Sequence, residues 1–261
     1  MWCDYEASYS ATLNDQGFLL WRELGAHNKA LNIVRVCHGI HVGSVVEIGC
    51  GTGDVLRFLN KMNLAREYSC VDVSVSTVQF ARKACAHFLK NAYISSANAL
   101  PFQEGTFDVA ILTHVLEHLV DPVCALREAS RVARFVVIEV PIEKVLSNAI
   151  RRKVLKRPYP SMLGSGHVQF WSQKSIVDFL ERDCGLTILE RHRDLISRDV
   201  EFHDKLGLSR VKPALKETLK TVLPQGIYCR LLTTHATFLC RSPASPGLNR
   251  DVSSVCRKEA V

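Results

Sequence analysis

Apolar and amphipathic segments alternate along the chain from about residue 43 onward, and this alternation predicts a parallel sheet covered by helices. Short apolar runs predict seven strands, at residues 45–48, 68–73, 92–94, 107–113, 135–140 and 186–189 and within 228–240. Helical patterns lie between them, at residues 55–59 and 75–89, after Asp121-Pro122, and from the N-cap Ser172 to Gly185. Pro141 is expected to close the fifth strand.

Three segments lie outside this alternation. Residues 17–38 form a helical stretch upstream of the sheet, and residues 211–223 have the pattern of an amphipathic helix with Pro213 near its start. Residues 242–261 begin Ser-Pro-Ala-Ser-Pro-Gly, and this composition predicts a disordered tail.

The first strand runs into a glycine-rich turn, and residues 45–53 read Val-Val-Glu-Ile-Gly-Cys-Gly-Thr-Gly. Backbone without a Cβ lets a nucleotide-like ligand approach closely. Glu47 would repel a pyrophosphate but suits a ligand that carries positive charge. S-adenosylmethionine, with its sulfonium and ammonium groups, is such a ligand. Together with the second strand, this stretch resembles motif I of the class I S-adenosylmethionine-dependent methyltransferases.

An acid at the end of the second strand supports the interpretation of the glycine turn as a cofactor site. Asp72 lies 19 residues after Gly53, where a dinucleotide-fold enzyme places the carboxylate that binds the ribose hydroxyls. A nicotinamide-dependent dehydrogenase uses the same device and is the natural competitor. The spacing here is Gly-x-Gly-x-Gly rather than Gly-x-Gly-x-x-Gly, and Glu47 would lie close to a diphosphate, so we favour S-adenosylmethionine.

A second block, residues 96–102 with 105–109 after it, also resembles the family. In the family an acid in this block contacts the adenine amino group, and Ser96 stands at that position here. Ser96 or Asn98 would then supply a neutral acceptor, and the Ala97 amide would serve the ring nitrogen. The resemblance implies a set of cofactor-binding residues: Glu47, Gly49, Cys50, Gly51, Gly53, Asp72, Val73, Ser96, Ala97, Asn98, Thr113 and His114.

Residues 113–122, Thr-His-Val-Leu-Glu-His-Leu-Val-Asp-Pro, resemble the family segment that lies beneath the transferable methyl group. His114 and His118 would share a face of a helix and, with Glu117, invite a zinc site. The order is His-x-x-Glu-His, however, and the family uses this stretch without a metal, so no metal is expected.

Residues 166–172 resemble the branch of the family in which a histidine and an aromatic residue precede the penultimate helix. His167 either faces the substrate pocket or is satisfied within the structure. If the acceptor is a hydroxyl, a base is needed, and His167, His114 and His118 are the candidates, with His167 first.

Composition sets limits on partners and location. The chain is 47% hydrophobic and 23% charged, and no apolar run approaches the roughly 18 residues that span a bilayer. Ten scattered cysteines without Cys-x-x-Cys spacing suggest reduced thiols in a cytoplasmic protein. Residues 142–230 hold 17 Lys and Arg against 10 Asp and Glu, so the excess charge could attract an anionic acceptor, nucleic acid or a membrane surface, or be a solvated face.

The resemblance implies an α/β Rossmann-like fold, with seven mostly parallel strands in the order 3-2-1-4-5-7-6 and helices on both faces. We expect one domain over residues 1–241, with an N-terminal helical lid (1–40), a core (43–241) and a cap segment (about 144–170). Tyr5, Tyr9, Trp21 and Arg22 are the candidate lid residues.

The expected reaction is S-adenosylmethionine-dependent methyl transfer to an O, N or C atom of a small molecule or glycan-like metabolite. Two alternatives stay open. One is an RNA methyltransferase that uses the basic segment 144–157 against phosphates. The other is a non-catalytic binding protein with the same fold, which the missing acid at Ser96 would suit.

Overall fold

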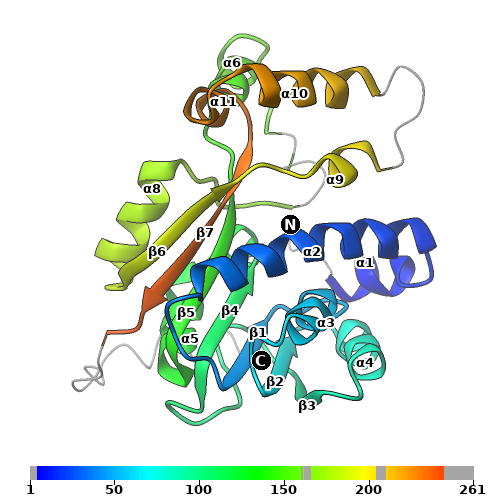
Figure 1. The fold of residues 1–261 in the computed structure, drawn as a ribbon, viewed down its shortest axis with the longest axis vertical. Helices are drawn as coiled ribbons and strands as arrows, with labels where there is room; N and C mark the ends of the chain where they lie inside the picture. Colours follow the sequence, from blue (N-terminus) through cyan, green and yellow to red (C-terminus); the bar gives the residue numbers. More distant parts are fainter. Residues whose placement is uncertain (1–4, 160, 162–165, 204–209, 244–261) are drawn as a thin grey trace.

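The computed structural model describes residues 5–159, 161, 166–203 and 210–243, and Figure 1 shows their arrangement. Seven strands form one sheet in the order β3-β2-β1-β4-β5-β7-β6, which confirms the predicted strand order. β7 is antiparallel to both of its neighbours, and the other neighbouring pairs are parallel. The strands are β1 (Ser44–Ile48), β2 (Glu67–Asp72), β3 (Leu89–Ile94), β4 (Phe107–Thr113), β5 (Ala133–Ile142), β6 (Thr187–Asp194) and β7 (Thr234–Arg241).

Helices connect the strands and extend the chain before and beyond them. The α-helices are α1 (Tyr5–Thr12), α2 (Gln16–Val36), α3 (Asp54–Lys61), α4 (Val75–Ala84), α5 (Pro122–Val132), α6 (Leu146–Lys153), α8 (Gln173–Asp178), α9 (Arg198–Phe202), α10 (Val211–Val222) and α11 (Gln225–Leu231). A 3-10 turn, η1 (Leu116–His118), comes after β4, and a π-helical turn, η2 (Phe179–Asp183), comes after α8.

Several predicted boundaries are wrong. α4 ends at Ala84 rather than at residue 89, because Leu89 pairs with Tyr68 and so begins β3. β5 continues through Pro141. The missing N–H of Pro141 is tolerated because β4 ends at Thr113, opposite Glu139, and no longer pairs with β5 at that point.

The prediction that residues 228–240 contain the seventh strand is confirmed, because β7 begins at Thr234. The residues before it, 225–231, form α11. Tyr228 and Cys229 are buried residues of this helix, so their apolar character reflects packing of a helix rather than of a strand. The predicted amphipathic helix over 211–223 is confirmed as α10.

Successive strand residues face opposite helix layers. Val136 and Ile138 pack into a core with α5 and α8, whereas Val45 and Val137 pack into a second core beneath α2, α3 and α4. Figure 1 shows α2 lying across this second face, toward β6 and β7. Because side chains alternate along a strand, Glu47 and Glu139 fall on the α2 side of the sheet.

A second group of helices lies beyond the carboxyl ends of the parallel strands. Figure 1 shows α6, α10 and α11 together at the top of the molecule, and α9 contacts both α10 and α2. The predicted cap at about 144–170 contains α6, and the described helices α9, α10 and α11 lie at the same end of the sheet.

The described cysteines differ from the expectation at one position. Seven are free thiols: Cys37, Cys50, Cys70, Cys85, Cys184, Cys229 and Cys240. Cys124 is disulfide-bonded, so the expectation of reduced thiols is wrong there, since spacing alone does not reveal pairing. No helix within the described ranges is long and apolar enough to cross a bilayer. The predicted tail lies outside the described residues from position 244 onward.

The N-cap of α5 gives a test of the fold. Asp121 accepts a hydrogen bond from the Cys124 amide at 3.1 Å, and Pro122 occupies the first turn, as predicted. Asp121→Ala should lower the free energy of unfolding by about 1 kcal/mol, and Asp121→Ser should retain most of it because serine also caps. Urea denaturation of the three proteins measures the difference. Equal midpoints for the alanine and serine variants would contradict the capping role.

Candidate functional site

The turn after β1 requires glycine at three positions. Gly49, Gly51 and Gly53 have φ angles of +76°, +52° and +77°, in the left-handed region that side chains disfavour. A Cβ on Gly49 would lie 2.5 Å from Val115 Cγ2, and one on Gly51 would collide with the Arg22 guanidinium. The turn therefore presents bare backbone beneath two specific side chains, one from the β4 end and one from α2.

The N-terminal helices cover this turn. Arg22 donates from Nε to Thr52 Oγ1 at 2.8 Å and from Nη1 to the Tyr9 hydroxyl at 3.2 Å, and its guanidinium lies over the Tyr9 and Phe18 rings. Two of the candidate lid residues, Tyr9 and Arg22, thus meet over the glycine turn, whereas Trp21 is exposed. The side chain of the fourth candidate, Tyr5, lies outside the described residues.

α1 is fixed to the same region by a carboxylate. Glu6 accepts hydrogen bonds from the Ser74 and Ser76 hydroxyls at the start of α4. These hydrogen bonds lower the pKa of Glu6. α1 therefore lies against the end of β2, close to Asp72.

Asp72 connects the glycine turn to the end of β2. One carboxylate oxygen accepts from the Gly51 amide at 2.8 Å, and the other accepts from the Ser74 amide at 3.0 Å. Each oxygen keeps a further lone pair, because a carboxylate has about four acceptor positions. Val73, the next residue, is 57% exposed.

The segment after β3 is joined to β2 by a hydrogen bond from the Ser95 amide to the Asp72 carbonyl, 3.0 Å long. Ser96 is exposed, and its hydroxyl accepts from the Asn98 amide at 3.2 Å. Ala97 is half-buried against the core. The Asn98 side-chain oxygen is buried and has no hydrogen-bond partner among the described atoms. Asn98 is therefore better suited than Ser96 to supply the neutral acceptor.

Glu47 lies at the end of β1 and is almost fully buried. Burial raises its pKa well above the usual value, and Cys70 adds to the rise, whereas Lys29 and Arg22 oppose it. Its Oε2 atom has no hydrogen-bond partner among the described atoms. The side chain thus offers a buried acceptor to a donor that carries positive charge. The neighbouring Cys50 shares a hydrogen bond with Cys70 and is buried, and both raise the pKa of the Cys50 thiol, so it is a poor nucleophile.

A second polar group lies at the carboxyl ends of β4 and β5. Thr113 ends β4 and is nearly buried, and His114 comes next with φ +58°, a conformation rare outside glycine. His114 Nδ1 lies 2.9 Å from Glu117 Oε1, and its Nε2 lies 3.4 Å from Glu139 Oε1. Burial lowers the pKa of His114, but the two carboxylates outweigh this effect and raise it overall.

His118 and His167 meet on the far side of Glu117. Their rings are 4.8 Å apart in an edge-to-face arrangement. His167 is buried, and its Nδ1 lies 2.8 Å from Glu143 Oε2, while the other Glu143 oxygen accepts from the Ser161 hydroxyl. Burial lowers the pKa of His118. The structure therefore brings together the three predicted histidines. Val115 lies in the same segment and packs beside Gly49, so this segment contacts the glycine turn.

Sequence reasoning missed four polar residues of this group. Glu139 and Glu143 lie in and just after β5, His235 lies on β7, and Lys29 lies on α2. Burial lowers the pKa of Lys29, while Glu139, Glu117 and Glu47 oppose the decrease. The one visible signal was Glu139, an acid inside the apolar run 135–140.

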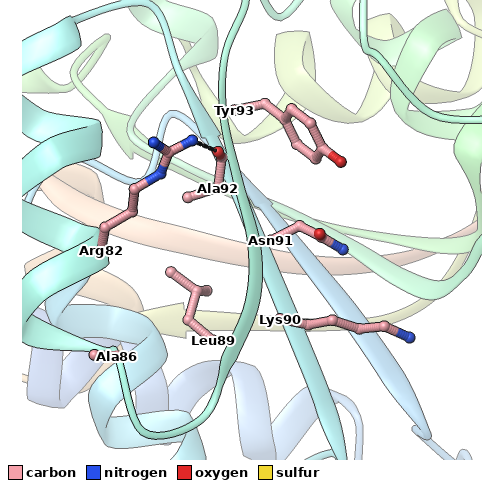
Figure 2. Close-up of a pocket in the computed structure, with 7 residues that line it drawn as sticks. All are labelled: Arg82, Ala86, Leu89, Lys90, Asn91, Ala92 and Tyr93. Carbon is pink, nitrogen blue, oxygen red and sulfur yellow. Dashed lines mark hydrogen bonds between the residues drawn. The ribbon is translucent and has the colours of Figure 1, made fainter.

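A separate hollow of about 400 Å³ lies at the β3 edge of the sheet, between α4 and β3. Figure 2 shows its lining, in which the Arg82 guanidinium donates to the Ala92 carbonyl. Tyr93, Asn91 and Lys90 also line it. None of the predicted site residues lines this hollow, so the hollow is distinct from the site around the glycine turn.

Comparison with known proteins finds a family match over the central part of the chain. Residues 46–135 match the family model described as a methyltransferase domain, and this range includes the glycine turn, Asp72 and the His114–His118 segment. The chain carries a class I S-adenosylmethionine-dependent methyltransferase domain. The cofactor of this domain is S-adenosylmethionine. The assignments of individual residues to the cofactor stay predictions.

Similar proteins extend beyond the matched range. A demethylmenaquinone methyltransferase from Thermotoga maritima is 28% identical over 188 residues, which cover 67% of this chain and 80% of that protein. An uncharacterized 37.1 kDa protein of transposon TN4556 from Streptomyces fradiae is 32% identical over 93 residues, and the match spans 35% of this chain but only 27% of that protein.

Solved structures share the fold at low sequence identity. Geranyl diphosphate C-methyltransferase from Streptomyces coelicolor, in complex with Mg²⁺, geranyl diphosphate and S-adenosylhomocysteine, superimposes with a TM-score of 0.59 at 13% identity. The match covers 83% of this chain and 78% of that chain.

The residues around the turn fit this cofactor. The three glycines let the turn pack closely against Val115, Arg22 and Cys85, and Glu47 and Asn98 each keep a buried oxygen without a hydrogen-bond partner among the described atoms. A cationic amino-acid part would suit the first oxygen, and an adenine amino group would suit the second.

Asp72 can be tested by binding. Asp72→Ala should raise the Kd for S-adenosylhomocysteine roughly 5- to 150-fold, the equivalent of about 1–3 kcal/mol for lost hydrogen bonds to a charged group. Asp72→Asn keeps one acceptor and should fall between the alanine variant and the parent. Isothermal titration calorimetry measures both, with circular dichroism as the check on folding. Unchanged affinity in a folded alanine variant would remove Asp72 from the ribose role.

Glu47 predicts a pH dependence. Burial raises the pKa of Glu47, so this carboxyl keeps its proton to a higher pH than an exposed glutamate does, and a bound cation favours the ionised form. S-adenosylmethionine should therefore bind more tightly as pH rises through the raised pKa, with release of a proton. Calorimetry in two buffers of different ionisation enthalpy measures this release. Glu47→Gln should abolish it, and equal release from both proteins would contradict the assignment.

Proposed function

We propose that this chain transfers the methyl group of S-adenosylmethionine to an O, N or C atom of a small molecule, including a glycan-like metabolite. The observation that carries the proposal is the buried His167–Glu143 pair, which lies beside the segment after β4. This pair is joined to the glycine turn through His118, Glu117 and Val115, so a base and the cofactor turn share one edge of the sheet.

The cofactor, when bound, supplies an electrophilic methyl group that already carries its leaving group. Asp72 would hold the ribose, and Asn98 with the Ala97 amide would hold the adenine. Glu47 would accept from the ammonium group. Arg22, which Thr52 and Tyr9 hold over Gly51, would pair with the carboxylate of the amino-acid part.

His167 is the candidate base for a hydroxyl acceptor. Glu143 lies against Nδ1 at 2.8 Å, so the carboxylate fixes the proton on that nitrogen and leaves the lone pair on Nε2. Nε2 would accept the proton of the acceptor as the new bond forms. His114 is less suited, because both of its ring nitrogens already face carboxylates. His118, packed edge-to-face on His167, would hold that ring in place.

The remaining contribution of the chain is alignment and exclusion of water. Orientation of two reactants can contribute roughly 7–11 kcal/mol to a reaction of this kind. α1 and α2 cover the glycine turn, and Glu117 and Glu139 are fully buried, so the acceptor would react in a site sheltered from solvent.

Contacts of the basic segment favour a small acceptor over RNA. Arg151 donates from Nε to the Pro158 carbonyl at 2.8 Å, and the Arg152 guanidinium lies over the Tyr159 ring. These arginines therefore fold the segment after α6 back on itself. The demethylmenaquinone and geranyl diphosphate methyltransferases are also named for small molecules.

Methyl transfer with a labelled cofactor tests the proposal. With tritiated S-adenosylmethionine, label should pass to members of a panel of small hydroxyl and amine compounds rather than to total RNA. His167→Ala should lower turnover of a hydroxyl acceptor roughly 10²- to 10⁴-fold, the usual loss of a general base, and leave S-adenosylhomocysteine binding unchanged. His38→Ala, at an exposed histidine, is the matched control.

Three results would overturn parts of the proposal. Label in RNA would favour the alternative that uses residues 144–157. Cofactor binding without transfer to any acceptor would favour the non-catalytic alternative. Loss of cofactor binding in His167→Ala would assign that residue to the cofactor pocket.

A further inference from the structure

We propose that His114, Glu139 and His235 bind a divalent transition-metal ion, with Zn²⁺ the best match to two imidazole nitrogens and one carboxylate oxygen. This site shares only His114 with the His-x-x-Glu-His pattern in the sequence, and its ligands come from three separate segments: the end of β4, β5 and the start of β7. Metal binding here does not depend on the proposed methyl transfer.

The three side chains converge on one point. His114 Nε2 lies 3.4 Å from Glu139 Oε1, His235 Nδ1 lies 3.8 Å from the same oxygen, and one donor atom of each residue lies within 4.8 Å of the others. Ligand atoms at 2.0–2.1 Å from a tetrahedral zinc are about 3.3–3.4 Å apart. The first distance already has this value, and the second is only slightly longer.

Glu139 has one satisfied oxygen and one that lacks a donor. Oε2 accepts from Thr237 Oγ1 at 3.0 Å and from Asn32 Nδ2 at 3.4 Å. Oε1 has no hydrogen-bond partner among the described atoms, although the side chain is 0% exposed. Leaving such an oxygen unsatisfied is costly, and this oxygen is the one that faces both imidazoles.

His114 has the surroundings of a metal ligand. Its Nδ1 faces Glu117 Oε1 at 2.9 Å, while Nε2 is buried without a hydrogen-bond partner among the described atoms. Metal-binding histidines usually donate their other ring N–H to a carboxylate, which fixes the tautomer and the ring orientation. The positive φ of His114 is the type of backbone strain that structures retain at functional positions.

The register of β5 and β7 places His235 opposite these atoms. Glu139 pairs with Thr237 and Pro141 with His235, so Glu139 and His235 are diagonal neighbours on the face that α2 covers. The His114 and His235 rings are 4.5 Å apart and edge-to-face. The His235 side chain is 24% exposed, so an ion could enter from that side.

A second group of potential ligands lies nearby, at Glu117, His118 and His167. Glu117 is already ion-paired with His114, and the Glu143 pair gives His167 the features of a base rather than a ligand. The two groups share no residue, so single variants distinguish them.

Three protein ligands leave one coordination position for water or for an acceptor atom, an arrangement typical of catalytic rather than structural zinc. The class of acceptor that fits is one with a hydroxyl or carboxylate oxygen. This last step rests on the proposed function, whereas the ion itself does not.

Metal titration of the purified full chain tests the site. After removal of metals with a chelator, Zn²⁺ should bind by calorimetry at one ion per chain, and Co²⁺ should give the intense visible bands of tetrahedral coordination. Glu139→Gln and His235→Gln should abolish this stoichiometric binding. Glu117→Gln should weaken it roughly 10- to 100-fold, as loss of an outer carboxylate does.

His167→Ala and His38→Ala are the controls, and both should keep the ion. If Glu139→Gln fails to fold, the substitution at the half-buried His235 still tests whether the metal binds here. Binding that survives His235→Gln but disappears in His167→Ala would overturn the assignment in favour of the second group. No binding to the parent, while S-adenosylhomocysteine still binds, would overturn the metal site and leave the proposed function standing.

Discussion

The carboxylates buried beneath α2 impose the constraint around which the rest of the site is arranged. Glu47 and Glu139 lie inside the sheet, with Glu117 beside them, and removing a carboxylate from water costs several kcal/mol unless partners compensate. For Glu139 and Glu117 the histidines His114, His118 and His235 supply the larger part of this compensation, and α2 adds to it. The helix brings Lys29 into the field of all three acids and places Asn32 against Glu139. Moving α2 away from the sheet would therefore remove Lys29 and Asn32 from the buried carboxylates.

Helix α2 also links α1 and the glycine turn to the sheet. Arg22 lies on the same helix as Lys29 and is fixed by Thr52 of the glycine turn and by Tyr9 of α1. The amide of Gly51 in turn donates to Asp72, at the end of β2. A displacement of α2 would disturb the charges under the sheet and the turn together. Cofactor affinity and stability are therefore expected to change in parallel when α2 is altered.

Local patterns predicted the parts of the molecule that are local. The α5 start at Asp121 and the glycine turn derive from short runs of residues, whereas the strand order is what the family resemblance implies. The structure confirms the order and the cap. The partners of the histidines could not be predicted in this way. His235 reaches His114 through strand pairing across more than a hundred residues, and Glu143 meets His167 across a segment that contains α6. Glu139 was visible as an acid inside the apolar run 135–140, but the pattern does not reveal that it faces His114 and His235.

The place of β7 in the sheet has a consequence for the order in which the site can form. β7 is inserted between β5 and β6, although it is the last of the seven strands to be synthesised. Until it pairs, β5 and β6 each present an open edge, and such edges invite pairing with other chains. Thr237 and His235 arrive on this strand, so a nascent chain that ends before β7 holds Glu139 without its closest donor. The long sequence separation of these contacts makes their formation slow, and an incomplete chain exposes both hydrophobic strands and a bare acid.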